Sequence, residues 1–172
     1  MGLALANDSK SYCQELFRFH RWRQYKISEL LTQVGAKYFS RQLNGSFSSL
    51  FIILNHLVWA EKVWLGRVNN NEVATMRDSS VAELLAAWRE ITDKWAHHVE
   101  TTPQEAFEET VVYFNSKGHR FENDLSEIVV HLIDHSTYHI GQMMNAVRGF
   151  GIEPVSTNYI HYLRAKLKEE EL

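Results

Sequence analysis

The chain has few residues that break helices and almost none that could form a disulfide. Its 172 residues include two prolines, eight glycines and a single cysteine, Cys13. So few breakers favour long helices over many short strands. One cysteine cannot form a disulfide within the chain, which is typical of proteins in a reducing compartment. We therefore expect a helical protein of the cytoplasm.

Charge and hydrophobic patterning exclude two classes of partner. The formal net charge is −3, which gives no general attraction to nucleic-acid backbones. No apolar run approaches the roughly 18 residues that a membrane span needs, and Met1 to Ala6 lack the basic start of a signal peptide. The basic run from Arg18 to Lys26, with Trp22 and Tyr25, leaves contact with nucleic acid open, but its charges spread around a helix, which favours a solvated face. We expect neither a nucleic-acid partner nor a membrane.

Apolar periodicity predicts four long helices. They run from about Ser9 to Gly35, Ser46 to Asn69, the residue after Ser80 to Thr101, and Asn123 or Asp124 to Gly149. The link after the third helix contains a hairpin-like stretch, Phe107 to Phe121, and a short helix is expected near Thr157 to Glu170. The expected fold is all-α: one domain over residues 1–172, a four-helix bundle with a crossover link between helices 3 and 4 and a short C-terminal helix.

Two histidines in the last long helix are the strongest chemical signal. His135 and His139 are four residues apart, so they project from one helical face and could bind one metal ion. The apolar stripe of this helix centres near Leu125 and Met143, with His139 roughly 40° and His135 roughly 80° from the centre. His139 should therefore face inward and His135 the rim. His131, about 120° away, is not expected to reach the same point.

A third ligand must come from another helix, and His56 is the best candidate. It lies on an apolar face of the second helix, with Ile53 one turn before it and Ala60 one turn after it. A buried imidazole needs partners for its nitrogens, and a metal ion would supply one. Another explanation stays open: His56 could be a hydrogen-bonded core histidine, and one pair at this spacing can arise by chance among nine histidines.

No general base can be assigned from the sequence. Ser136 follows His135, so the built-in glutamate of the His-Glu-x-x-His motif is absent. Glu61 and Asp134 are candidate bases, although both are explained more simply as surface or capping charges. The remaining reactive or aromatic side chains are expected to be structural, with His97 and His98 on the surface, and Cys13, Trp59, Trp64, Trp88 and Trp95 in the core.

The histidine motifs resemble those of the DinB/YfiT-like metalloenzyme family. The first is His56 followed by the aromatic-rich stretch that ends at Trp64, and the second is His135-Ser-Thr-Tyr-His139-Ile-Gly-Gln142. The segments Tyr113 to Gly118 and Pro154 to Leu163 are also similar to the family pattern. The chain departs from it at Ile140, where arginine is usual, and at Asn158, where aspartate is usual.

The resemblance implies a four-helix bundle, commonly a homodimer, with a divalent metal ion held by His56, His135 and His139. Zinc or nickel is expected first, with iron and manganese as further options. The implied function is a metal-dependent enzyme of the thiol-dependent transferase or hydrolase type, acting on a small-molecule substrate or a low-molecular-weight thiol. The alternative is a non-catalytic metal-binding stress or interaction protein.

Overall fold

The computed structural model describes residues 9–71 and 80–170, and most of these are helical. The long helices are α1 (Ser9–Gln33), α3 (Leu50–Val68), α4 (Val81–Thr101) and α5 (Leu125–Gly149). The shorter elements are α2 (Ala36–Phe39), the 3₁₀ helix η1 (Glu105–Glu108), β1 (Thr110–Phe114), β2 (Arg120–Asp124) and α6 (Tyr159–Glu170). The all-helical class is confirmed in the main, with a small antiparallel hairpin added where the sequence predicted one.

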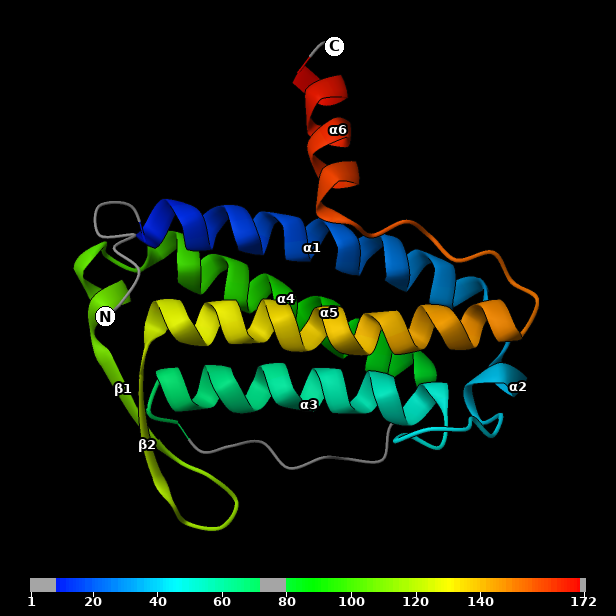
Figure 1. Cartoon of the computed structure of the whole chain (residues 1–172), viewed down its shortest axis with the longest axis horizontal. Helices are drawn as coiled ribbons and strands as arrows, with labels where there is room; N and C mark the ends of the chain where they lie inside the picture. Colours follow the sequence, from blue (N-terminus) through cyan, green and yellow to red (C-terminus); the bar gives the residue numbers. More distant parts are fainter. Residues whose placement is uncertain (1–8, 72–79, 171–172) are drawn as a thin grey trace.

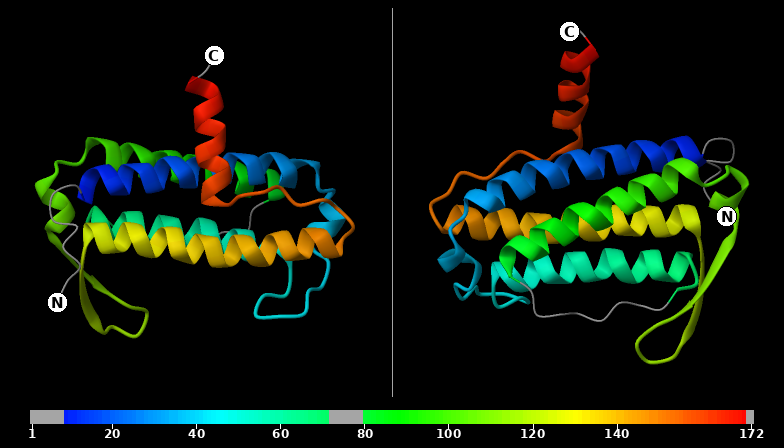
Figure 2. Two further views of the ribbon diagram at one scale, coloured as in Figure 1. Left: turned by 45° about the horizontal axis from the view of Figure 1, so that its top comes forward. Right: turned by 180° about the vertical axis from the view of Figure 1, so that it is seen from behind.

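Each long helix packs against two of the others. α1 and α3 each contact both α4 and α5 (Figures 1 and 2). α3 and α4 both begin at the end of the molecule that carries α2, so they run in the same direction, whereas α1 and α5 run the opposite way (Figure 1). This arrangement places α3 beside α5, the two helices that carry the candidate metal ligands.

The sequence predicted a crossover between α4 and α5, and this prediction is wrong. These helices join at one end of the molecule through η1 and the hairpin (Figure 1). The link does not cross the molecule because β1 and β2 pair with one another, from Thr110 opposite Asp124 to Phe114 opposite Arg120, and the chain doubles back. α3 and α4 both end at the hairpin end of the molecule (Figure 1).

Side-chain caps set where the long helices begin. The Ser49 hydroxyl accepts the Ile52 N–H, so α3 begins at Leu50 and not at the expected Ser46. Ser80 with Glu83, and Asp124 with Glu127, form capping boxes at the starts of α4 and α5.

Trp88 and Trp95 of α4 are fully buried core residues, as expected. No helix in the described ranges is long and apolar enough to cross a membrane, and Met1 to Ala6 lie outside those ranges.

A buried polar relay connects α1, α3 and α4. His20, Arg23 and Glu61 are each only 1% exposed. The Arg23 guanidinium donates to His20 Nδ1 from Nε at 3.3 Å and from Nη2 at 3.1 Å, so Nδ1 carries no proton and His20 Nε2 donates to Glu61 Oε1 at 3.1 Å. Trp88 and Thr92 donate to the same carboxylate. Burial lowers the pKa of His20, which keeps this imidazole neutral between the two charges.

Arg23 extends the relay to α5. Its Nη2 donates to the Ile133 carbonyl at 3.0 Å and its Nη1 to Thr137 Oγ1 at 2.5 Å, on either side of His135. Two sequence expectations were therefore wrong. The sequence assigned the basic side chains from Arg18 to Lys26 to a solvated face, but His20 and Arg23 are buried because they fall on the same stripe as Ile27. Glu61 is a buried acceptor of hydrogen bonds and not a surface or capping charge.

We predict that Glu61→Ala lowers the free energy of unfolding by about 3–5 kcal/mol, because the buried Arg23 charge loses its counter-charge and the three donors to the carboxylate lose their acceptor. Urea denaturation measures this loss. The control is Glu90→Ala on the exposed surface of α4, where Glu90 pairs with Lys94 and the change should stay within about 1 kcal/mol. Equally small losses in both variants would show that the relay does not stabilise the fold.

Candidate metal centre

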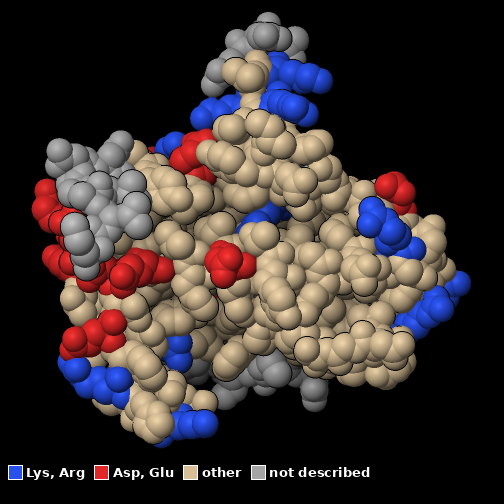
Figure 3. Space-filling model, viewed as in Figure 1, with Lys and Arg blue, Asp and Glu red and all other residues tan. Residues whose placement is uncertain are grey.

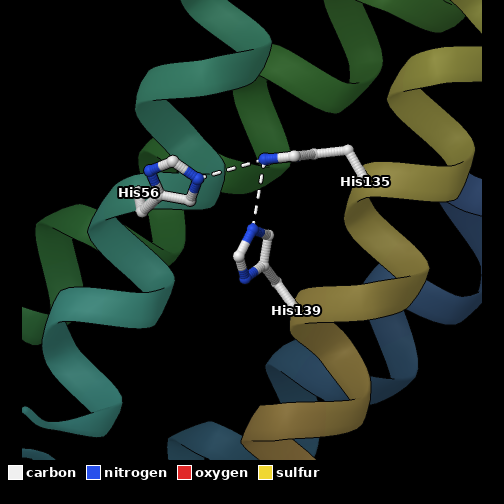
Figure 4. Close-up of side chains that lie close together, drawn as sticks. All are labelled: His56, His135 and His139. Atoms are coloured by element: carbon white, nitrogen blue, oxygen red, sulfur yellow. Dashed lines mark hydrogen bonds between the residues drawn. The ribbon is translucent and has the colours of Figure 1, made fainter. Parts of the chain in front are cut away.

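The structure brings together the three histidines that the sequence singled out. His56 projects from α3, and His135 and His139 project from α5 toward the same point (Figure 4). His135 Nε2 lies 3.0 Å from His56 Nε2 and 3.1 Å from His139 Nε2. The ligand atoms of all three residues lie within 4.8 Å of one another. In a tetrahedral site with nitrogens at about 2.0–2.1 Å from the metal, neighbouring nitrogens are about 3.3 Å apart. The three histidines are therefore positioned to hold a metal ion.

Protonation also fits a metal site. Burial, reinforced by His139, His56 and His131, lowers the pKa of His135 to about 4. Burial, followed by the effect of His139, also lowers the pKa of His56. Near pH 7 both rings are therefore neutral, which is the form that binds metals. Three Nε2 atoms cannot all satisfy one another, because a single N–H on His135 can point at only one neighbour, whereas a cation would use all three lone pairs.

Gln142 accounts for the other nitrogen of His139. Its side-chain oxygen lies 2.9 Å from His139 Nδ1. If Nε2 of His139 faces a metal, Nδ1 carries the proton and donates it to Gln142 Oε1, which fixes both the tautomer and the ring orientation. Gln142 ends the sequence motif that begins at His135, but its position in that motif did not predict a contact with His139.

Aromatic side chains surround the histidines. The Phe47 ring lies 5.2 Å from the ring of His56 and 5.2 Å from that of His139, and comes from the connection before α3. Trp59 lies 6.1 Å from His56, and Tyr138 lies 5.0 Å from His139. Sequence reasoning missed Phe47, because a single phenylalanine in a loop carries no periodic signal. Trp59, expected in the core, is half-buried beside the site.

The other side chains that the sequence singled out are buried or exposed as predicted, except for His98. His139 is buried, His135 half-buried and His131 exposed, which follows their expected order from the apolar stripe. The His131 ring lies 5.7 Å from that of His135, but outside the group of three. Cys13 is buried, whereas Asp134 and His97 are exposed, all as expected. His98 is half-buried against Trp95 and is not the surface residue that was expected.

We predict that the metal-free protein loses stability as the pH falls from 7.5 to 5.5. The folded-state pKa values of His20, His56 and His135 lie below the usual value of 6.5, so the unfolded chain binds protons that the folded chain does not. Stability is therefore highest above pH 6.5 and decreases below it. Urea denaturation at each pH measures the slope, which should be shallower in His135→Gln. Equal or higher stability at pH 5.5 would contradict these pKa directions.

Comparison with known proteins identifies the family of this chain. The family model described as the DinB family matches residues 6–172. Among curated proteins, the chain is similar to Protein DinB of Bacillus subtilis (strain 168), with 18% identity over 160 residues, covering 87% of this chain and 92% of that relative. Because the match to the family model extends over nearly the whole chain and includes all three histidines, the chain belongs to the DinB family.

Proposed function

We propose that this protein is a metal-dependent enzyme built on a four-helix bundle, with one divalent ion held by His56, His135 and His139. The convergence of the three Nε2 atoms supports this proposal most strongly. In the described part of the chain, no fourth histidine, cysteine or carboxylate joins this group. Three protein ligands with a remaining open position are typical of catalytic sites and not of structural ones. Imidazole ligands suit zinc or nickel first, with iron and manganese as further options.

A bound divalent ion would lower the pKa of a water or thiol at the open position and so supply a nucleophile near neutral pH. The residues of the chain contribute orientation and shielding. Gln142 fixes the His139 ring, and Phe47 covers the rings of His56 and His139 on one side. The reaction we propose is thiol-dependent transfer or hydrolysis of a small-molecule substrate.

A second copy of the chain is the proposed protein partner. Ile52 of α3, Tyr138 of α5, and Phe114 and Phe121 of the hairpin are large apolar side chains that remain exposed. Much of the face in Figure 3 carries neither basic nor acidic side chains. Burying such surface in a homodimer would remove it from water, which supports the homodimer that family membership suggests.

We predict that the purified protein binds one divalent ion per chain and that His56→Ala, His135→Ala and His139→Ala each weaken binding by more than about 100-fold, because each removes a direct ligand. Elemental analysis after dialysis, with circular dichroism to verify folding, measures the effect. The control is His97→Ala, which removes an exposed histidine of α4 and should leave the metal content unchanged. Full metal retention in all three ligand variants would reject the assignment.

An open coordination position separates the enzyme from a non-catalytic metal protein. We predict that azide added to the cobalt(II)-loaded protein changes the visible absorption spectrum saturably, because the anion enters the position that the histidines leave free. His97→Ala should behave like the wild type. A spectrum that azide leaves unchanged would indicate a closed site and favour the non-catalytic metal-binding stress or interaction protein.

A further inference from the structure

A cavity of about 360 Å³ lies directly beside the candidate metal centre. It shares two side chains with the centre: Phe47, which packs on the rings of His56 and His139, and Gln142, which bonds to His139. Ile53, one helical turn before His56, forms part of its wall. Its volume is within the range of small-molecule sites. A molecule bound in this cavity would therefore lie against side chains that contact the His56 and His139 rings.

Gln142 offers a hydrogen-bond donor to such a molecule. Its side-chain oxygen is committed to His139 Nδ1, so its amide nitrogen is left for other acceptors. In the described ranges that nitrogen makes no hydrogen bond. Asn145, one turn further along α5, also lines the cavity. The α5 wall of the cavity thus carries two carboxamide side chains.

Arg41 supplies the positive charge at the cavity. Its guanidinium lies 5.3 Å from the centre of the Phe150 ring, and that ring stacks on Tyr38 at 5.1 Å. A guanidinium held by stacking keeps its in-plane N–H groups available for a carboxylate. The described part of the chain gives the Arg41 side chain no carboxylate partner, and no acidic residue lines the cavity. Figure 3 shows mainly basic side chains at the α2 end of this face, whereas acidic ones gather at the opposite end.

A second arginine, Arg67, lies at the hairpin end of the site, where other groups of the protein already bind its side chain. Arg67 of α3 lies 4.5 Å from the Trp64 ring and 4.8 Å from the Tyr113 ring, and it donates to the Phe114 carbonyl. It therefore holds the hairpin against α3. Arg41, by contrast, lines the cavity that is also lined by Phe47 and Gln142.

We propose that this cavity is the substrate site and that it selects small molecules carrying a carboxylate, with Arg41 binding the carboxylate and the reactive end directed to the metal position. The proposal rests on the proposed function, since it needs a metal with an open position. It assigns specificity to a residue outside both histidine motifs, and it gives the loop before α3 a role in recognition.

The test uses the cobalt(II)-loaded protein and two series of thiols. One series is ω-mercaptocarboxylates of increasing chain length, and the other is mercaptoalcohols of matched length. Each thiol loses its proton to solvent when its sulfur binds the metal, and the resulting near-ultraviolet absorption reports binding. At the best chain length we expect the carboxylate to bind about 10-fold tighter than the alcohol, because one charge-assisted hydrogen bond contributes about that factor. Arg41→Gln should abolish this preference without changing the metal content.

Two matched variants make the outcome decisive. Arg148→Gln also removes one positive charge, near the C-terminal end of α5. Arg148 lines a different cavity, so the carboxylate preference should persist. Arg67→Gln tests the opposite end of the site. Loss of the preference only in Arg67→Gln, its persistence in Arg41→Gln, or its absence in the wild type would overturn the pocket assignment while leaving the metal site intact. Failure to retain cobalt, or failure of every thiol to bind, would overturn the proposed function and the pocket together.

Discussion

The proposed function depends on the separation of α3 and α5, because the imidazoles that could share a cation come from both helices. The relay of Arg23, His20 and Glu61 controls that separation from inside the molecule. Arg23 bonds to α5 on either side of His135, and Glu61 lies five residues after His56 on α3. His20 joins the two charges. A buried charge that loses its partner is costly, so the relay resists any rearrangement that would separate the helices.

Holding three imidazoles this close together is unfavourable without a cation, and this cost supports a metal ion at their centre. Burial and mutual repulsion lower the pKa of His135, so the cluster does not accept the protons that could otherwise stabilise it. The two Nε2–Nε2 contacts of 3.0 and 3.1 Å both involve His135 Nε2, and this single atom of a neutral ring cannot form a full hydrogen bond to both neighbours. A divalent ion would convert this mismatch into three coordinate bonds. The cavity that Arg41 lines is bordered by Phe47 and Gln142, which contact the rings of the cluster.

Helical periodicity in the sequence predicted the long helices and the inward order of His139, His135 and His131, and the strand-like stretch before the last long helix predicted the hairpin. Periodicity could not show which helices are neighbours or in which direction each runs, so the crossover expected between α4 and α5 was wrong. The same limit hid Arg23 and Glu61: a charged residue in a helix gives no sign of burial until its partners on other helices are known. Phe47 and Arg41 lie in a connection, where position depends on the packing of its neighbours.

X-ray absorption spectroscopy of the zinc-loaded protein would identify the ligands around the ion. If His56, His135 and His139 hold the metal, we expect three imidazole nitrogens at about 2.0–2.1 Å, completed by light atoms from solvent. Cys13 is buried in the core, away from the histidines, so no sulfur should appear. A spectrum without imidazole scattering, or one with a sulfur ligand at about 2.3 Å, would rule out the three-histidine site.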